Sequence, residues 1–428
     1  MKITAFAIGS YGDFLPILSL GKELKSRGHQ VTIATFEEFK SVCEDSDLIF
    51  KKISGNSKEL VSLLLGNSKN TRSEGIGGIA FLLNKYPELF MQFNSACISS
   101  DLIIYTLFGA LSYHFAEKYK IPLVRSFVFP FDPTTKFCSL VNKAKRNSIS
   151  SYIWYYKCYI FFNMGSLSVV NEWRKKLGLG KWNIFRSYRN MNRKKIITLY
   201  QYDTILAERD KNWSEHIFIT GVWRNLSLNR TNNDKEKIDD FFKRNKNIVY
   251  VGFGSMVYDD MKKLFEMVLC SILELDKDIS VVISGSDFSF MDTMNDEDKF
   301  RVLLVDYIDF NQYMHKFRAA IHHGGNGTVH CCLEFGVPQL IFAFGADQLF
   351  WGQQCYELGI GPSPIYVKNK LNMDEIKEKV NELINMKKYK ENSEKLKKYI
   401  TKDGVKVATN IIEKKFKVGN NKDERRNK

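Results

Sequence analysis

The 428-residue sequence has no paired cysteine motif, no long apolar run and no signal-like start. Its eight cysteines show no CxxC spacing, and their scatter through a large chain indicates reduced thiols rather than disulfides. No stretch reaches about 18 uninterrupted apolar residues, so we expect no membrane span. The apolar run at residues 3–8 is too short for a secretory signal peptide. These absences favour a cytoplasmic protein.

Proline is also scarce, with 8 residues against 27 glycines, and this excludes a Pro-rich or collagen-like chain. With 44% hydrophobic and 26% charged residues, the composition is that of a globular protein. A chain of this length exceeds one ordinary domain, so two domains are expected.

Acidic residues are nearly missing from one region. Between residues 134 and 200 the chain has 14 Lys or Arg and one acid, Glu172, and residues 386–428 hold 15 basic and 6 acidic residues. The net charge of +15 is therefore concentrated in two regions. Two interpretations remain open: a basic, aromatic surface that rests on the inner face of an anionic membrane, or a solvated basic face over an ordinary domain core.

The hydrophobic pattern predicts two successive α/β units. Residues 3–8 and 31–35 form short apolar runs on either side of a glycine turn and an apolar helical stripe. This βαβ beginning implies a doubly wound parallel sheet. A second strand–turn–helix begins at residue 247. We expect an N-terminal domain at 1–224, a linker at 225–237 and a second α/β domain at 238–388. A helix at 389–417 that returns to the first domain and a disordered basic tail at 418–428 complete the chain.

A glycine-rich segment follows an apolar strand in the second unit. It reads HHGGNGT at residues 322–328 and opens an apolar helical stretch. Glycines let backbone N–H groups approach a ligand, and a helix N-terminus adds partial positive charge. Together they predict an anion site suited to a diphosphate. The full order of strand, HHGGNGT, helix, GVP, strand and DQ is more specific than the glycine turn alone.

These motifs resemble those of the UDP-glycosyltransferase superfamily, in particular sterol glucosyltransferases and vancomycin-group antibiotic glycosyltransferases. The matching stretches are GSYGDFLP at 9–16, RGHQVT at 27–32, YVGFGSM at 250–256, HHGGNGT at 322–328, GVP at 336–338, DQ at 347–348, FWG at 350–352 and GIGP at 359–362. Residues 55–210 are largely unmatched, apart from EWRKKLGL at 172–179. The resemblance implies a GT-B fold, in which two Rossmann-like domains face an interdomain cleft. It also implies that the domain at 1–224 binds the acceptor and the domain at 238–388 binds the nucleotide sugar.

The resemblance also implies roles for individual residues. The implied phosphate ligands are Ser255, His323, Gly325, Asn326, Gly327 and Thr328. Tyr307 would stack on the base, the backbone of Ile308 would read its edge, and Asp347 and Gln348 would bind sugar hydroxyls. Asp309 replaces the proline that usually follows Tyr307, so the match at Tyr307 is looser. Ala343 replaces the proline that usually precedes the DQ pair, and this change leaves the sugar identity open.

Asp13 follows the cleft loop that contains Gly9 and Gly12, and two roles fit it. Its carboxylate could take the proton of an acceptor hydroxyl as that hydroxyl attacks the anomeric carbon. It could instead only cap the helix that begins near Phe14. We favour the base, and the nearby helix N-terminus favours the ionised form.

Other interpretations are weaker. His322, His323, His330, Cys331 and Cys332 are close in sequence but lack a familiar zinc spacing, so no metal is expected. Asp45-Ser46-Asp47 resembles a metal-binding DxD, but its position before an apolar stretch favours a turn. The first glycine turn lacks the third glycine of a dinucleotide fingerprint. His114 and His216 have no partner visible in the sequence.

The sequence thus predicts an inverting, metal-independent glycosyltransferase. It would move a hexose, preferably glucose, from a UDP-sugar co-substrate to a hydroxyl of a hydrophobic, lipid or sterol-like acceptor, without a cofactor and without nucleic acid. The alternatives are a natural-product glycosyltransferase using a TDP- or UDP-sugar, an epimerase on the same fold, and a nucleotide-sugar-binding helper.

Overall fold

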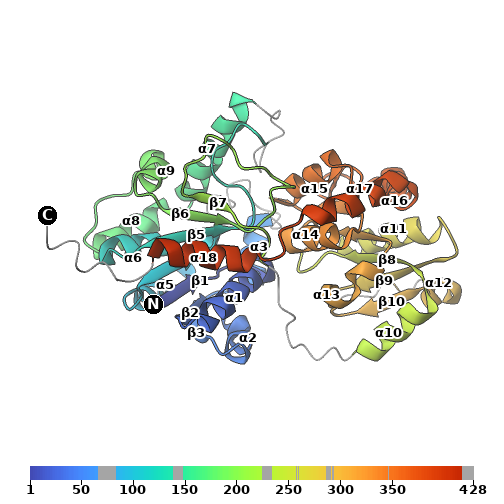
Figure 1. Ribbon diagram of the computed structural model, residues 1–428, viewed down its shortest axis with the longest axis horizontal. Coiled ribbons are helices and arrows are strands. Elements are labelled where there is room, and N and C mark those ends of the chain that lie inside the picture. The colour runs from blue at the N-terminus through green and yellow to red at the C-terminus, as the bar shows by residue number, and fades with distance from the viewer. Residues whose placement is uncertain are drawn as a thin grey trace.

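The computed structural model consists of two α/β units that lie side by side (Figure 1). It describes residues 1–65, 83–137, 148–223, 234–256, 258, 260–285, 291, 294–345 and 347–416. Each unit contains one parallel sheet with helices packed on it. The expected pair of Rossmann-like domains is confirmed.

The N-terminal unit is built on a seven-stranded sheet with the order β3-β2-β1-β4-β5-β6-β7. Its strands are β1 (Lys2–Phe6), β2 (Gln30–Thr35), β3 (Ile49–Lys52), β4 (Leu102–Tyr105), β5 (Leu123–Phe127), β6 (Ile197–Tyr200) and β7 (Ile217–Ile219). Its helices are α1 (Tyr11–Ser26), α2 (Lys40–Asp45), α3 (Ser57–Leu65), α5 (Leu89–Cys97), α6 (Ser112–Tyr119), α7 (Ile149–Met164), α8 (Leu167–Lys176) and α9 (Ile184–Arg193), with 3-10 turns η1 (Glu37–Phe39) and η2 (Leu107–Leu111).

The C-terminal unit has a six-stranded sheet with the order β10-β9-β8-β11-β12-β13. Its strands are β8 (Asn247–Gly252), β9 (Ile279–Ser284), β10 (Val302–Val305), β11 (Ala319–His322), β12 (Gln339–Ala343) and β13 (Ile365–Tyr366). Its helices are α10 (Lys235–Arg244), α11 (Met261–Leu273), α12 (Asp296–Phe300), α13 (Phe310–Tyr313), α14 (Asn326–Phe335), α15 (Asp347–Glu357), α16 (Met373–Asn385) and α17 (Lys387–Leu396), with 3-10 turns η4 (Met314–Lys316) and η5 (Lys397–Tyr399).

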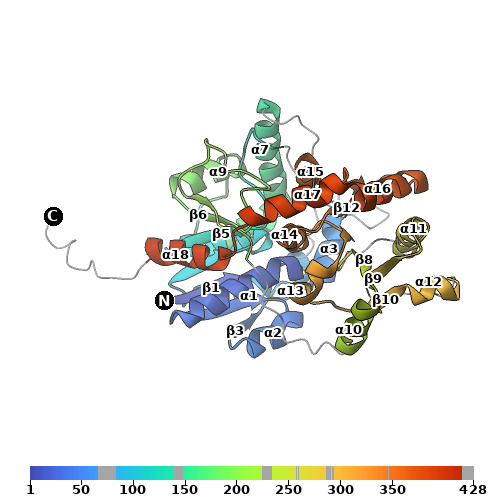
Figure 2. The same cartoon turned by 45° about the vertical axis from the view of Figure 1, so that its right-hand side comes forward.

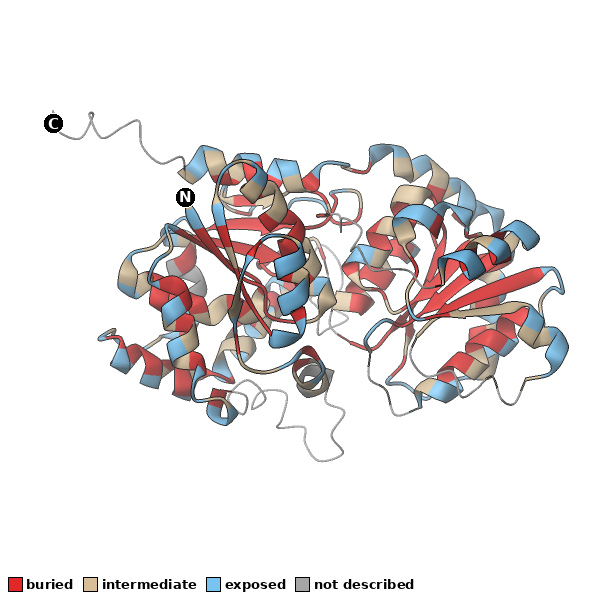
Figure 3. Cartoon of the chain, turned by 90° about the horizontal axis from the view of Figure 1, so that it is seen from below, coloured by how far each residue is buried: buried red, intermediate tan, exposed pale blue. Residues whose placement is uncertain are grey.

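The central strands are buried because helices cover the sheets, as Figure 3 shows. All four residues of β4 and all five of β12 are buried. Parallel strands that are covered on both faces read as continuous apolar runs rather than alternating ones. This is why the short apolar runs at residues 3–8 and 31–35 predicted strands β1 and β2 correctly.

The strand order reverses at one point in each sheet. In the first sheet this point lies between β1 and β4, and in the second between β8 and β11. The connections leaving such neighbouring strands turn to opposite faces and open a crevice at the carboxyl edge, where ligands of α/β proteins bind. The GSYGD loop follows β1 and the HHGGNGT segment follows β11. Both motifs therefore lie at positions where this topology builds sites.

Some boundaries differ from the expected ones. Helix α1 begins at Tyr11 rather than near Phe14, because Ser10 caps it, and Pro16 consequently lies inside the helix beyond its first turn. Helix α10 begins at Lys235, so the end of the expected linker is helical, while residues 224–233 lie outside the described residues. The expected tail at 418–428 also lies outside them.

The C-terminal segment consists of two helices where one was expected. Helix α17 ends at Leu396, and α18 (Gly404–Phe416) starts after a break. In Figures 1 and 2, α17 stays with the C-terminal unit whereas α18 lies over the N-terminal one, where it packs against α1. The chain thus returns to its first domain.

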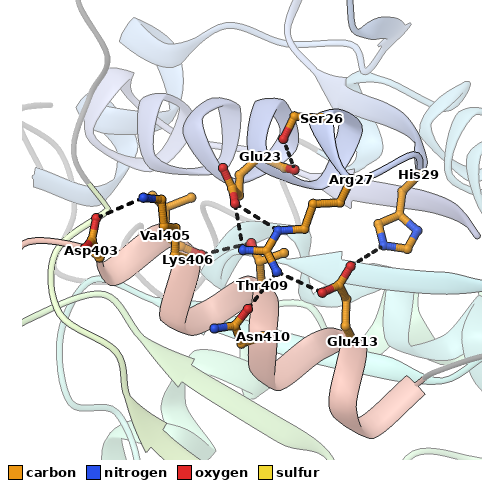
Figure 4. A network of polar contacts seen from close by, with 10 residues as sticks. All are labelled: Glu23, Ser26, Arg27, His29, Asp403, Val405, Lys406, Thr409, Asn410 and Glu413. Carbon is orange, nitrogen blue, oxygen red and sulfur yellow. Dashed lines mark hydrogen bonds and ion pairs between the residues drawn. The ribbon is translucent and has the colours of Figure 1, made fainter.

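Polar contacts hold α18 in place (Figure 4). Arg27, at the end of α1, donates to Asn410 Oδ1 at 2.6 Å and to Glu413 Oε2 at 2.8 Å. His29 Nε2 lies 3.2 Å from Glu413 Oε1. Because Arg27 also binds Glu23, its planar guanidinium joins α1 to α18 through several bonds at once.

The segment that carries the chain back passes very close to the end of the first domain. A Cβ on Gly404 would lie 2.4 Å from the Val222 carbonyl oxygen, and one on Gly221, whose φ is +82°, would lie 2.7 Å from Thr401. Only glycine permits this approach of the two backbones.

We predict that Gly404→Ala lowers the free energy of unfolding by about 1–3 kcal/mol, because the new methyl group meets backbone atoms that cannot move aside. Thermal unfolding followed by calorimetry measures this loss. Gly180→Ala is the matched control, since a Cβ there meets no atom within 4 Å. Equal melting temperatures for the two variants would contradict this account of the crossing.

Candidate functional site

The loop after β1 holds the Asp13 carboxylate in a fixed position. Ser10 N donates to Asp13 Oδ2 at 2.9 Å, and Gly12 N donates to the Ser10 hydroxyl at 3.2 Å. This reciprocal pair is a capping box at the start of α1. A Cβ on Gly9, whose φ is +148°, would lie 2.2 Å from Asp13 Oδ2, so this position requires glycine.

The cap occupies only one of the two carboxylate oxygens. Among the described residues, none donates a hydrogen bond to Asp13 Oδ1. Asp13 is half-buried at the carboxyl edge of the sheet. The two roles considered for Asp13 are therefore compatible, since Oδ2 serves the helix and Oδ1 remains available for chemistry.

The pKa of Asp13 is higher than the helix N-terminus alone suggested. Burial raises it to about 6, although the Ser10 hydrogen bonds lower it in part. Removal of a carboxylate from water disfavours its charged form, and here this effect exceeds the stabilisation by the helix and its cap. The hydrogen bonds at the helix N-terminus favour the ionised form as expected, but burial outweighs them. A pKa near 6 suits a group that accepts a proton near neutral pH.

The glycine-rich turn after β11 is supported from beneath by His322. This buried ring accepts a hydrogen bond from Gly324 N through Nδ1 at 3.0 Å, and its Nε2 lies 2.9 Å from Gln339 Oε1. Burial lowers the pKa of His322 to about 3, with a smaller effect from the charge of His323. His322 is thus a neutral structural residue that holds Gly324 at φ +83°.

His323 lies between two glycines at the surface of the turn. A Cβ on Gly254 would lie 3.0 Å from its Cε1, and one on Gly325 would lie 2.6 Å from its Nε2. No described residue hydrogen-bonds its buried Nδ1. Burial lowers the pKa of His323 to about 4, and the nearby Gly252 carbonyl offsets part of this shift without completing a hydrogen bond. The ring is therefore neutral, with a polar edge toward the loop that carries Ser255.

Helix α14 begins at Asn326, with Gly325 as its N-cap. The free backbone N–H groups of its first turn point out of the helix end, as an anion site requires. Gly327 is exposed, Thr328 is partly exposed, and Ser255 is exposed in the loop after β8. The structure thus brings these predicted phosphate ligands to neighbouring loops of one sheet edge.

The DQ pair starts α15, and its two residues have different environments. Gln348 Oε1 accepts from Phe344 N at 2.7 Å and from Gly345 N at 3.3 Å, while its Nε2 lies 3.2 Å from Met256 Sδ. The side-chain oxygen of Gln348 therefore stabilises the turn before α15. Its amide nitrogen, on a weak sulfur partner, is the part available to a ligand.

Asp347 lies close enough to Asp13 for the two charges to interact across the domain boundary. The pKa of Asp347 is raised to about 7, first by burial and then by the negative charge of Asp13. This interaction joins the loop after β1 to the start of α15.

Tyr307 and Ile308 follow β10, the outermost strand of the second sheet. Ile308 is buried and Tyr307 is partly exposed. Asp309, where relatives of this sequence pattern have proline, caps α13 by accepting from Asn311 N at 2.9 Å. Asp309 therefore caps the short helix α13 at the position of the usual proline.

The domains are joined directly behind the glycine-rich turn. His330 Nδ1 lies 2.8 Å from the Asn326 carbonyl, and Nε2 lies 2.9 Å from Asp203 N, in the other domain. Since a carbonyl only accepts and a backbone N–H only donates, Nδ1 carries the proton and the ring is neutral. The Asn326 side chain also crosses the boundary and donates to the Gln201 carbonyl at 2.9 Å.

The Trp351 indole packs against both sides of this junction. Its ring meets His330 at 5.6 Å and Tyr202 at 5.5 Å between centroids. Asp203 Oδ2 accepts from Thr401 N at 2.7 Å, which brings in the segment before α18. Sequence reasoning missed these contacts, because nothing in the local pattern of residues 201–203 pairs them with α14 or α15.

An apolar cavity lies in the N-terminal unit beside the GSYGD loop. It has about 840 Å³ of empty space, part of it open to solvent. Aromatic and aliphatic side chains form most of its wall, among them Ile8, Phe36, Leu60, Phe93, Phe108 and Leu111. Ile8 is the residue before Gly9, so the cavity adjoins the Asp13 loop. Most of the lining comes from residues 55–182, in the region that matched no motif, which explains why the sequence did not reveal the cavity.

The described residues include no cluster of three or more metal-ligating side chains. Asp45 ends α2 and Asp47 adopts a left-handed turn with φ +55°, which confirms the turn interpretation of Asp45-Ser46-Asp47. Of the helices in the described ranges, none is long and apolar enough to cross a bilayer.

Comparison with known proteins gives family matches in both units. Residues 3–137 match the glycosyltransferase family 28 N-terminal domain, and residues 266–412 match the erythromycin biosynthesis protein CIII-like, C-terminal domain. A sterol 3-beta-glucosyltransferase of Vanderwaltozyma polyspora is 30% identical over 423 residues, a match covering 95% of this chain and 34% of that protein. The chain thus spans about a third or less of the curated relatives it matches.

Solved structures show the same fold at low identity. The glycotransferase of kitacinnamycin superposes with a TM-score of 0.71 at 15% identity and covers 96% of this chain and 98% of its own. The glycosyltransferase VinC, solved in complex with dTDP, has a TM-score of 0.62 at 15% identity and covers 93% and 95%.

We predict that Asp13→Asn lowers the pKa of Asp347 below about 7, because the substitution removes the like charge that raises it. Carboxyl carbon chemical shifts followed over pH 4–9 measure this change. Asp309→Asn, at the cap of α13, is the control and should leave the pKa of Asp347 in place. An unchanged Asp347 titration in Asp13→Asn would show that the two carboxylates do not interact.

Proposed function

Because the chain belongs to the glycosyltransferases of GT-B architecture, we propose that it transfers glucose from UDP-glucose to a sterol-like hydroxyl with inversion and without a metal. One observation carries this proposal. The Asp13 carboxylate lies on the loop that follows Ile8, a residue of the cavity wall, and its charge raises the pKa of Asp347 at the start of α15. An acceptor in the cavity and a donor sugar at Asp347 would meet at that carboxylate.

The C-terminal unit would bind the nucleotide sugar. The backbone N–H groups at the start of α14 and the neutral His323 ring would hold the diphosphate, with the Ser255 hydroxyl on the facing loop. Asp347 and the amide nitrogen of Gln348 would bind the sugar hydroxyls. Tyr307 and Ile308, at the outer edge of the same sheet, would receive the base.

The N-terminal unit would supply the acceptor and the base. The acceptor hydroxyl would give its proton to Asp13 Oδ1 while its oxygen forms a bond to the anomeric carbon. The bond from that carbon to the diphosphate breaks, and UDP leaves with the electron pair. Attack from the face opposite the diphosphate inverts the anomeric configuration. Asp13 is poised for this step because the backbone N–H and the hydroxyl of Ser10 hold its other oxygen.

Two observations support a sterol-like acceptor and glucose. The curated relatives that align with most of this chain are sterol 3-beta-glucosyltransferases, and the cavity wall is predominantly apolar. A natural-product glycosyltransferase with a TDP-sugar is the second candidate, favoured by the VinC structure with dTDP. An epimerase or a binding helper would need neither the apolar cavity nor a free carboxylate beside it.

We further propose that α7 rests on an anionic membrane. Its exposed apolar side chains follow a helical spacing that forms one stripe, consisting of Ile149, Tyr152, Ile153, Phe161 and Met164. Tyr155 and Tyr159 are instead buried core residues. The domain-core interpretation therefore applies to these two tyrosines, and the membrane contact is proposed for the exposed residues alone. Lys157 lies beside the stripe, and the surrounding region is strongly basic. Each well-placed cation would contribute about 1 kcal/mol on an anionic leaflet.

We predict that Asp13→Asn reduces kcat at least about 100-fold, within the usual contribution of a general base, while UDP binding measured by thermal shift is retained. UDP release from UDP-glucose with cholesterol added measures the transfer. Asp45→Asn is the matched control and keeps normal turnover. Turnover without any acceptor would instead indicate an epimerase or hydrolase, and binding without turnover in the wild type a helper.

We predict that kcat/KM falls as the pH drops below about 6. The transferring form needs the Asp13 carboxylate ionised, and burial raises its pKa to about 6. The rate should therefore be constant above this pH and decline about tenfold per unit well below it. An acid limb near pH 4, where an unperturbed carboxyl titrates, would argue against Asp13 as the base.

We predict that the protein floats with phosphatidylserine vesicles at low salt and dissociates at high salt, because the attraction is partly electrostatic. Replacement of Ile149, Ile153 and Phe161 by serine should abolish flotation. Phe300→Ser removes an equally exposed ring from α12 in the other domain and should have no effect. Absence of the wild-type protein from the vesicle fraction at low salt would refute the membrane contact.

A further inference from the structure

A buried histidine in the wall of the apolar cavity has an unused hydrogen-bond donor. His114, in the first turn of α6, lines the cavity and is 5% exposed. Its Nδ1 lies 3.0 Å from Arg174 Nη1. The sequence alone showed no partner for His114. The fold supplies one from α8.

This contact determines where the imidazole proton lies. Arginine has only donors, so Nδ1 must accept and a neutral ring must carry its proton on Nε2. Burial first, and then the positive charges of Arg174 and Lys194, lower the pKa of His114 to about 3. The ring is therefore neutral throughout the physiological range, with Nε2–H as its only donor.

The ring is held firmly in this orientation. Tyr113 and Trp182 meet it edge-on, with centroid distances of 5.5 and 5.0 Å. Arg174 is itself fixed, because its Nε donates to the Gly180 carbonyl at 2.6 Å and its Nη1 to Glu117 at 3.2 Å. A rotation of His114 would leave Arg174 and the ring without their mutual bond.

Within the described ranges, nothing accepts a hydrogen bond from His114 Nε2. Other polar residues of the cavity wall already have partners in the protein: the Ser54 hydroxyl accepts from Gln92, the Asn56 carbonyl oxygen accepts from Glu59 N, and the Asn163 amide donates to the Tyr159 carbonyl. A buried donor without a partner costs free energy unless a ligand or water satisfies it. His114 thus offers a hydrogen-bond donor to the cavity from a wall that is predominantly apolar.

We propose that His114 is a specificity-determining residue for the acceptor, and that Nε2–H donates to a second oxygen of that molecule. The inference rests on the proposed function, because it takes the cavity as the acceptor site. The favoured acceptor is an apolar polycyclic alcohol with a carbonyl or hydroxyl besides the hydroxyl that receives the sugar. The reacting hydroxyl would lie at Asp13, on the loop after β1, whereas His114 lies on α6, after β4. The two oxygens are therefore at separate points of the acceptor.

Three sterols test this proposal with the full chain. Cholesterol has one oxygen, whereas 7-ketocholesterol and 25-hydroxycholesterol each have a second one, on the rings and on the side chain respectively. Binding is measured without donor by the tryptophan fluorescence of Trp182, which lies in the cavity wall, and transfer is measured separately as kcat and KM. In the wild type, at least one two-oxygen sterol should bind roughly 10- to 100-fold more tightly than cholesterol.

The variants separate the hydrogen bond from the shape of the residue. His114→Phe keeps a flat ring but removes the donor, so the preference should disappear through KM with kcat nearly unchanged. His114→Gln places an amide N–H near the same point and should restore part of the preference, and both variants are first checked for a wild-type melting temperature. If His114→Phe fails to fold, the comparison of His114→Gln with the wild type still measures the preference.

Equal binding of all three sterols by the wild type, or an undiminished preference in His114→Phe, would overturn the proposal. A preference that depends on His114 in the binding measurement, without any sugar transfer, would support the role of His114 and refute the proposed function instead. Sugar transfer to all three sterols that the His114 variants leave unchanged would support the proposed function and refute the role of His114.

Discussion

The hydrogen bond between Asp203 N and His330 Nε2 is the contact on which the arrangement of the two domains depends. It exists only with a neutral ring in one tautomer, and the Asn326 carbonyl selects that tautomer by accepting from Nδ1. Asn326 also opens α14, the helix that begins directly after the glycine-rich turn. The first turn of α14 therefore has free backbone N–H groups and also a side chain that bonds the other domain.

This junction explains how a site can be assembled from segments far apart in the chain. Asp13 belongs to the first domain and Asp347 to the second, yet the charge of one raises the pKa of the other. The return of α18 to α1, with glycines at the crossing, adds a second connection between the domains. Asp13 has both a local and a tertiary role, since one oxygen completes the cap of α1 and the charge of the carboxylate acts on Asp347 in the other domain.

Much of the fold was predictable because its signals are local. Residues 3–8 and 31–35 were predicted as strands because parallel strands buried on both faces need continuous apolar side chains. Strands β6 and β13 were missed, because one lies in a basic, irregular region and the other has only two residues. The start of α1 was placed too late, as the Ser10–Asp13 capping box was not recognised. The C-terminal segment was predicted as one helix and is two.

The sequence by itself determined the motifs whose chemistry is carried by neighbouring residues: the glycine turn at 322–328, the Asp13 loop and the DQ pair. Backbone N–H groups and helix ends follow from local order, so a short segment is enough to specify them. Only the tertiary structure decided the contacts of His114 with Arg174, of His330 with Asp203, and the apolar cavity. Burial and the choice of partner set the pKa values and tautomers of these groups, and both depend on residues that meet only after the chain has folded.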